Sequence, residues 1–182
     1  EGLEIMRHTL AAQVLAKAIK KLYPNSKLAI GPTIDNGFYY DVLFKKKISN
    51  EDLPLIESEM KKIIAEGSFI NKTLKSKTDT IEIFKKKEEN YKVDIIENSE
   101  QDKNFQIYQH GESDFVDLCR GPHLPSLKFI GVFKLTKIAG AYWKGDSKNE
   151  MLQRIYGTAW RTDKELYDYL NMLEEAEKRD HR

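Results

Sequence analysis

The stretch of residues 117–123, Asp-Leu-Cys-Arg-Gly-Pro-His, concentrates side chains that are suited to chemistry. It holds the single cysteine of the chain, Cys119, and one of its four histidines, His123, and it begins with Asp117. A thiol and an imidazole four residues apart, around a Gly-Pro turn, can bind a metal ion or line a hydrolytic pocket. The same spacing is compatible with a small buried cysteine beside a turn. Taken alone, the stretch leaves these alternatives open.

Six further motifs occur with this stretch in a fixed order along the chain. They are Arg7-His8, residues 30–41 (Ile-Gly-Pro-Thr-Ile-Asp-Asn-Gly-Phe-Tyr-Tyr-Asp), Tyr91-Lys92-Val93, residues 133–143 (Phe-Lys-Leu-Thr-Lys-Ile-Ala-Gly-Ala-Tyr-Trp), residues 154–160 (Arg-Ile-Tyr-Gly-Thr-Ala-Trp) and residues 178–182 (Lys-Arg-Asp-His-Arg). Together the motifs cover nearly the whole chain and resemble the amino-terminal editing domain of bacterial threonyl-tRNA synthetase. The resemblance implies hydrolysis of seryl-tRNA(Thr). Serine escapes the synthetic site because one methylene is worth only ~1–3 kcal/mol in a pocket.

The resemblance also implies which residues form the site. The catalytic candidates are His8, Lys92 and His123, and Lys92 matches a lysine thought to act on the ester or its water. Physically, Lys92 could stabilise an oxyanion or, if desolvated, help to manage a proton. Asp117 could bind the substrate ammonium or be an ordinary strand-end carboxylate, and a strand tyrosine is often a core residue. The substrate-binding candidates are Tyr40, Asp117, Cys119 and Gln13.

The first predicted helix departs from the family pattern, which places His-x-x-x-His there. Alanine stands at position 12. Counting back from Pro24 without a gap puts Thr9 and Gln13 on the two histidine positions, whereas counting forward from His8 implies one extra residue. An extra residue in a helix is commonly absorbed as a π-bulge. We therefore predict a bulge or a shifted start in this helix, with His8 in the first position and Gln13 in the second.

The missing histidine argues against a metal, because only His8, Cys119 and His123 remain as strong ligands and glutamine binds zinc poorly. Related alanyl-type editing proteins use zinc through both residue pairs, but the threonyl family is not expected to need it. We expect no metal and no other cofactor in this chain. The resemblance places ATP and zinc in an aminoacylation core, whose class II motifs this chain lacks. It implies an editing domain at residues 1–175 and the start of a connection to that core at residues 176–182.

Three functions are compatible with these observations. The first is an editing hydrolase in which water attacks the seryl ester. The second is a module that binds the tRNA acceptor end and has weakened or lost editing, because the second helix histidine is replaced. The third is a zinc hydrolase of the alanyl type. The expected partners are tRNA(Thr) carrying serine and the rest of the synthetase, which in the family is a homodimer.

Length and composition favour a globular protein of one domain, or of one domain with two lobes, at 182 residues. The contents of 40% hydrophobic and 32% charged residues are ordinary. No apolar run approaches the ~20 residues that cross a bilayer, and neither a signal peptide nor a lipidation motif is visible, so we expect no membrane partner. One cysteine permits no internal disulfide, which fits the cytoplasm.

The 30 basic and 29 acidic residues nearly cancel, so nucleic-acid binding would require a local patch. Residues 128–148 are the candidate, because lysines can neutralise phosphates while aromatic rings stack on bases. The patch consists of Lys128, Lys134, Lys137, Lys144 and Lys148 with Phe133, Tyr142 and Trp143. The alternative is a core strand with solvated lysines.

Periodicity predicts an α+β fold with a largely antiparallel sheet, because helices and strands intermix without a βαβ rhythm. We expect helices at about residues 4–22, 49–67 and 78–87 and a last helix that begins at Thr162. The expected strands are residues 27–30, 38–44, 69–74, 92–96, 105–108, 115–118, 129–138 and 151–156.

Overall fold

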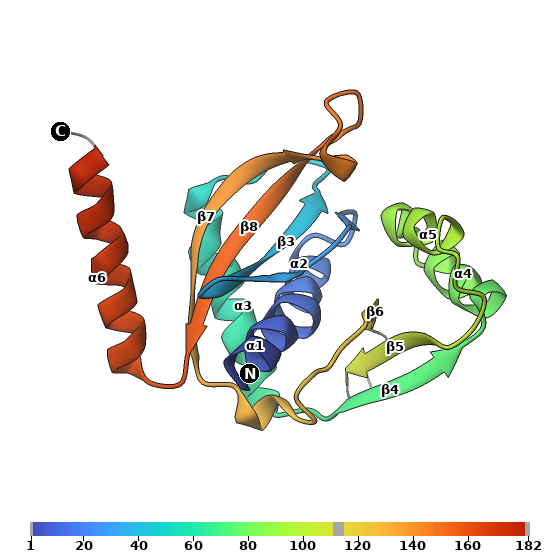
Figure 1. Cartoon of the computed structure of the whole chain (residues 1–182), viewed down its shortest axis with the longest axis horizontal. Coiled ribbons are helices and arrows are strands. Elements are labelled where there is room, and N and C mark those ends of the chain that lie inside the picture. Colours follow the sequence, from blue (N-terminus) through green and yellow to red (C-terminus); the bar gives the residue numbers. More distant parts are fainter. Residues whose placement is uncertain (1, 111–114, 181–182) are drawn as a thin grey trace.

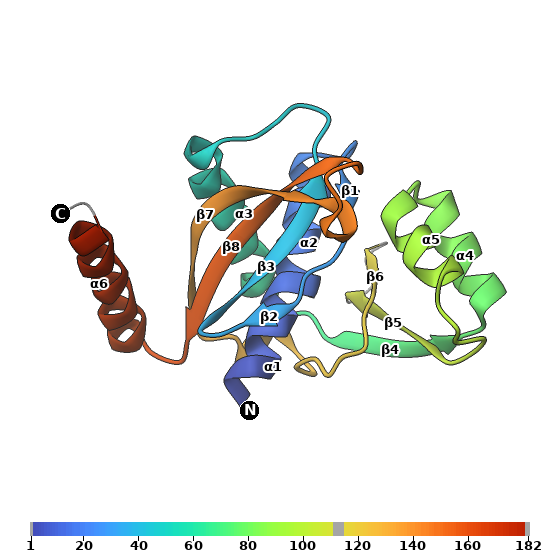
Figure 2. The same cartoon turned by 45° about the horizontal axis from the view of Figure 1, so that its top comes forward.

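The chain forms two antiparallel sheets with a long helix between them. The computed structural model describes residues 2–110 and 115–180. In Figures 1 and 2 the larger sheet and the smaller sheet lie on opposite sides of the N-terminal helix, and α3 packs on the same face of the larger sheet as that helix. The α+β class with antiparallel sheets is therefore confirmed.

The N-terminal helix is continuous but changes its winding in the middle. It consists of α1 (Gly2–Thr9), a π-helical segment (Leu10–Leu15) and α2 (Ala16–Leu22). All six residues of the π-helical segment are buried. An extra residue in an α-helix would rotate everything beyond it by about 100° and would turn one apolar face to water. The wider π turn absorbs that residue, so the predicted bulge is confirmed.

The larger sheet has the strand order β1-β3-β8-β7. The short strand β2 pairs with the beginning of β3, and β1 pairs with its end. Its centre requires close packing, since Phe38 pairs with Gly157 and the Phe38 ring occupies the space of a Cβ at that glycine. A tight turn with Asn36 at φ 64° joins β2 to β3. The strands are β1 (Lys27–Leu28), β2 (Thr33–Ile34), β3 (Gly37–Leu43), β7 (Val132–Tyr142) and β8 (Met151–Trp160).

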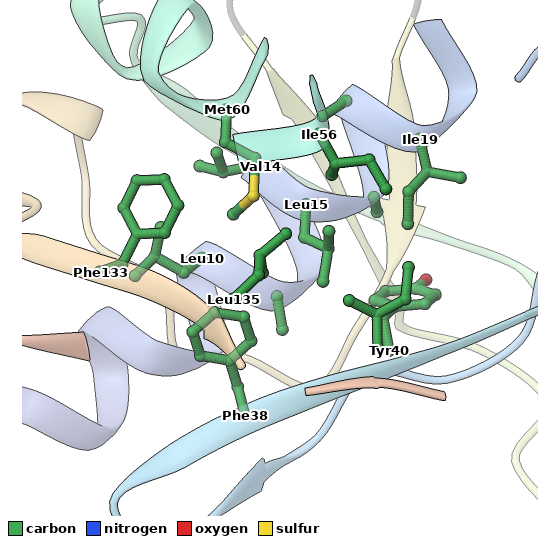
Figure 3. Close-up of a cluster of buried hydrophobic side chains, with 14 of the residues drawn as sticks. Leu10, Val14, Leu15, Ile19, Phe38, Tyr40, Ile56, Met60, Phe133 and Leu135 are labelled. Atoms are coloured by element: carbon green, nitrogen blue, oxygen red, sulfur yellow. The ribbon is translucent and has the colours of Figure 1, made fainter. Parts of the chain in front are cut away.

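The main hydrophobic core lies between this sheet and two helices. Figure 3 shows side chains of the N-terminal helix, of α3 (Leu53–Glu66) and of the strands pointing toward one another. A short 3-10 turn (Asn50–Asp52) leads into α3 through a capping box formed by Ser49 and Asp52. Gly67, at φ 62°, ends the helix as predicted. The labelled core side chains are Leu10, Val14, Leu15, Ile19, Phe38, Tyr40, Ile56, Met60, Phe133 and Leu135.

The smaller sheet and the two helices beside it form a second unit, which we call the small lobe. It consists of β4 (Ile70–Lys75), α4 (Lys77–Lys86), α5 (Asn90–Glu97), β5 (Phe105–His110) and β6 (Val116–Leu118). The prediction of a strand at residues 92–96 was wrong, because these residues belong to α5. Val93 and Ile96 are three apart on one helical face and pack on Phe84 of α4 and Phe105 of β5. Burial of that face selects the helix.

Two short turns and the last helix complete the fold. Turns of 3-10 helix occur at Leu127–Phe129 and Trp143–Gly145. Thr162 accepts a hydrogen bond from the Glu165 N–H at the start of α6 (Asp163–Asp180), where the last helix was predicted. This helix contains no buried residue, and it extends away from the larger sheet in Figure 1. The proposed boundary between residues 175 and 176 lies inside α6 and stays a prediction, while residues 181 and 182 lie outside the described residues.

Within the described ranges, none of the helices combines the length and the apolar character that crossing a bilayer requires.

The π-helical segment carries an internal cost that can be tested. Gln13 is fully buried, and neither atom of its side-chain amide has a hydrogen-bond partner among the described residues. A buried polar group without a partner costs about 1–3 kcal/mol. We therefore expect Gln13→Met to raise the free energy of unfolding by about 1–3 kcal/mol in urea titrations. The exposed residue Gln101 offers a control, since Gln101→Met should change it by less than about 0.5 kcal/mol. An unchanged stability of Gln13→Met would contradict the expectation.

Candidate active site

Three buried polar side chains meet between the larger sheet and the small lobe. Lys92 of α5 lies 2.9 Å from the Asp117 carboxylate of β6 and donates a 2.7 Å hydrogen bond to the hydroxyl of Tyr40 on β3. Tyr40 in turn donates to the other carboxylate oxygen of Asp117 at 3.1 Å. The exposed fractions are 4% for Lys92, 0% for Tyr40 and 1% for Asp117. Three elements that are distant in sequence therefore share one closed network.

Counting protons shows what this network leaves free. Burial and the neighbouring Asp117 hold the pKa of Tyr40 well above its usual range, so the phenol keeps its proton. The Asp117 carboxylate also accepts the backbone N–H of Leu118 at 2.8 Å. The ammonium group of Lys92 has three N–H donors, and two of them are used by Tyr40 and Asp117. The third donor has no hydrogen-bond partner among the described residues, and Lys92 is one of the residues that line a cavity.

A second cluster consists of His8 and Cys119, which line the same cavity, and of His123 behind them. The His8 Nε2 atom lies 2.9 Å from the Cys119 sulfur, and the His8 and His123 rings lie 4.6 Å apart. Burial raises the pKa of the Cys119 thiol to about 11, so the sulfur stays protonated at neutral pH. Burial lowers the pKa of His8, and burial together with His8 lowers that of His123 to about 3. Both imidazoles are therefore neutral at pH 7.

These three residues are the described group that could hold a metal ion, since one donor atom from each lies within 4.8 Å of the others. Structural zinc sites use four protein ligands, and catalytic sites use three with a water. Ala12, which lines the cavity beside His8, has no donor atom. The described residues of this cluster therefore offer three metal ligands, one of which is a thiol whose pKa is raised.

The cavity has a volume of about 790 Å³, which is in the size range of ligand pockets. His8, Lys92, Asp117 and Cys119 line it. Parts of residues 99–106 and the Ile30-Gly31-Pro32 segment line it as well. Gly31 is needed for close approach, because a Cβ at that position would meet the Tyr40 ring at 2.1 Å. The cavity thus combines an available ammonium donor, a neutral imidazole and a protonated thiol.

Comparison with known proteins connects this cavity to aminoacyl-tRNA synthetases. Residues 106–156, which include Asp117, Cys119 and His123, match the threonyl and alanyl tRNA synthetase second additional domain. The whole chain is 60% identical to part of the threonine–tRNA ligase of Francisella philomiragia. It is 55% identical to the threonine–tRNA ligases of Francisella tularensis subspecies holarctica and tularensis. Residues 106–156 are thus similar to that domain, and the chain as a whole is similar to part of these ligases.

The chain spans only part of the length of the relatives that it matches. The matched relatives are similar in their amino-terminal region, and the chain covers 28% of the length of each.

The predicted site residues occupy three kinds of position in the structure. His8, Lys92, Asp117 and Cys119 line the cavity. Tyr40 and His123 lie behind them and contact Lys92 and His8 respectively. Gln13 is buried and is not among the cavity-lining residues, whereas Ala12 is. The assignment of roles to all seven residues stays a prediction.

Two contributions to the site were not found from the sequence. Thr9 hydrogen-bonds His123, and its position directly after His8 was the available signal. Parts of residues 99–106 line the cavity, and nothing in the composition of this segment indicates that they do. Both omissions concern contacts that only the tertiary fold creates.

The candidate nucleic-acid patch at residues 128–148 is partly engaged within the domain. Phe133 is buried, Lys134 pairs with Glu57 at 3.1 Å, and Lys144 pairs with Asp94 at 2.9 Å. These contacts resemble the alternative of a core strand with solvated lysines more than an open phosphate-binding surface.

The buried neutral histidines predict how stability depends on pH. Burial lowers the pKa of His123 to about 3 and that of His110 to about 4, while an unfolded histidine has a pKa of about 6.5. Below pH 6.5 the unfolded chain therefore binds more protons than the folded chain, and the free energy of unfolding falls as the pH falls from about 6.5 toward 4. Each group contributes up to about 1.4 kcal/mol per pH unit.

Replacing either histidine should make this dependence shallower. We expect His123→Gln and His110→Gln each to reduce the slope between pH 6.5 and 5 by up to about 1.4 kcal/mol per pH unit, and the double variant to reduce it further. Urea titrations at several pH values measure the slope. Parallel curves for the wild type and the variants would show that these groups do not titrate on unfolding as described.

Proposed function

We propose that this domain is a cytoplasmic editing hydrolase that releases serine from seryl-tRNA(Thr) by attack of water on the aminoacyl ester. The observation that carries the proposal is the Lys92 ammonium, which is held by Asp117 and Tyr40 and has one donor left for the cavity. Ester hydrolysis passes through a tetrahedral intermediate whose oxygen gains negative charge. A fixed cation at the wall of a cavity suits that charge.

Lys92 acts as an electrostatic donor in this mechanism and not as a base. The carboxylate of Asp117 lies 2.9 Å from the Lys92 nitrogen, and the closed network holds that nitrogen in place before the substrate arrives. Removing one oxyanion donor typically costs ~10²–10³ in rate. In this assignment Asp117 serves as the counter-ion of Lys92 in addition to any contact with the substrate ammonium.

His8 is the group best placed to accept the proton of the attacking water. It lines the cavity, it is neutral because burial lowers its pKa, and Asp117 opposes that shift and so supports the protonated form once it appears. General-base catalysis typically contributes 10²–10⁴ in rate. Cys119 is a protonated thiol beside this base, so water and not sulfur is the proposed nucleophile.

Discrimination between serine and threonine is proposed to come from exclusion. The extra methyl group of threonine would displace the attacking water or clash with the wall near Lys92 and Cys119. A pocket that only binds cannot separate two substrates that differ by one methylene by more than about 10–200-fold. A repulsive contact adds to that limit.

The second candidate is a module that binds the acceptor end of tRNA and has weakened or lost hydrolysis. It is favoured by Ala12, which lines the cavity where the family pattern has a second histidine and supplies no polar group. Under either function the proposed partners are tRNA(Thr) carrying serine and the rest of a homodimeric synthetase.

Deacylation of labelled seryl-tRNA(Thr) without ATP tests the proposed function. We expect release of serine above the buffer rate, with threonyl-tRNA(Thr) spared. Lys92→Ala and His8→Ala should each slow release by roughly 10²-fold or more, because each removes a group that acts on the oxyanion or the proton. Cys119→Ala should cost less. A wild-type rate equal to the buffer rate would favour the binding module, and complete loss in Cys119→Ala alone would indicate covalent thiol catalysis.

Metal removal tests the alanyl-type alternative. Because the proposed mechanism assigns the oxyanion to Lys92 and the proton of the water to His8, it needs no metal, and we expect deacylation to be unchanged after treatment with a chelator and after addition of zinc. Loss of activity on chelation, with recovery on zinc addition, would establish a zinc hydrolase instead.

The chain should not perform the synthetic reaction. In the family, ATP and zinc serve the aminoacylation core, and the chain has no class II motifs. Incubation with ATP, threonine and tRNA should therefore give no threonyl-tRNA, and its formation would overturn the assignment.

A further inference from the structure

The hydroxyl group of Thr9 has three polar neighbours, and it is fully buried beside the site. It lies 2.9 Å from the Ile5 carbonyl oxygen, 3.0 Å from the Leu124 nitrogen and 3.2 Å from the Nδ1 atom of His123. The exposed fraction of Thr9 is 0%. Solvent therefore does not reach this hydroxyl, and its hydrogen bonds to the three neighbours can be assigned by counting protons.

The hydroxyl has one proton and two lone pairs. A carbonyl oxygen can only accept, so the 2.9 Å contact with Ile5 requires the proton of Thr9, as in the usual back-bond of a helical threonine. The Leu124 N–H can only donate, and it takes one lone pair. One lone pair remains for His123, and a lone pair can only accept. The Nδ1 atom of His123 must therefore carry the proton.

The geometry points to Thr9 as a positioning residue for the proposed hydrolytic site: its hydroxyl holds His123 in the tautomer protonated at Nδ1, so that Nε2 is the proton acceptor of the ring. This inference rests on the proposed function for its role in the reaction, but the tautomer itself is a property of the chain alone. Within the described residues, Nε2 of His123 is buried and has no hydrogen-bond partner.

The surroundings of His123 explain why an acceptor matters there. Its ring lies 4.6 Å from the His8 ring and 4.5 Å from the Tyr108 ring, and the donor atoms of His8, Cys119 and His123 lie within 4.8 Å of one another. Cys119 is a protonated thiol, and His8 becomes a cation if it takes the proton of the attacking water. A neutral acceptor beside these groups can receive a hydrogen bond from them, whereas a ring protonated at Nε2 would present another donor.

The tautomer can be measured without a substrate. Long-range 15N–1H correlation spectra of the histidine rings in the 182-residue chain distinguish protonation at Nδ1 from protonation at Nε2. The His123→Gln variant identifies the signals of His123. We expect the wild type and Thr9→Ser, which keeps the hydroxyl, to show His123 protonated at Nδ1. We expect Thr9→Val, which keeps the shape and removes the hydroxyl, to show a mixture or the other tautomer.

Kinetics separate positioning from a purely structural role. The wrong tautomer of a catalytic imidazole can cost up to ~10⁴ in kcat. We expect Thr9→Val to lower kcat for seryl-tRNA deacylation by about tenfold or more, with KM changed less than about threefold, and Thr9→Ser to restore the rate.

Each outcome bears on a different claim. His123 protonated at Nε2 in the wild type, or at Nδ1 in Thr9→Val, would overturn the inference, and the wild-type spectrum decides even if Thr9→Val does not fold. A switched tautomer with an unchanged kcat would overturn the positioning role. The expected tautomers in a chain that has no deacylase activity would support the assignment made for Thr9 and contradict the proposed function.

Discussion

The buried ion pair between Lys92 and Asp117 is the interaction on which the rest of the site depends. It joins α5 and β6 of the small lobe, and through Tyr40 it joins both to the larger sheet. Loss of one partner from a buried pair costs about 3–5 kcal/mol, because the other charge is left unpaired. The pair therefore determines how the two units meet, and the cavity at their junction depends on that geometry.

The π-helical segment lets one helix contribute to both the site and the main core. His8 and Thr9 face the cavity side, while Leu10 and Val14 must remain in the main core. With an extra residue in the helix, regular winding could satisfy one requirement but not both. The wider turn keeps one face of the helix toward the site and the other toward the core. It also buries the side-chain amide of Gln13 without a hydrogen-bond partner among the described residues. The altered helix thus preserves the first histidine position although the second histidine is absent.

Local patterns predicted much of the fold and only part of the site. The fold class and the ends of α3 followed from periodicity and caps, which act over a few residues. The altered N-terminal helix followed from counting residues against the His-x-x-x-His pattern of the resembled family. The strand predicted at residues 92–96 was wrong because a short aliphatic run fits either element, and packing on Phe84 decides. The hydrogen bonds of Lys92 and Thr9 depend on tertiary contacts between distant segments, and no local pattern contains that information.

The central claim is that Asp117 acts on the reaction through the ammonium of Lys92, and a double-mutant cycle in deacylation kinetics tests it most directly. The rates to compare are those of the wild type, Asp117→Asn, Lys92→Met and the double variant. The account predicts that Asp117→Asn slows release of serine strongly in the wild type and much less once Lys92 is methionine, where only the effect of Asp117 on His8 and on the substrate remains. Losses that multiply in the double variant would show that the two residues act independently and would contradict the account.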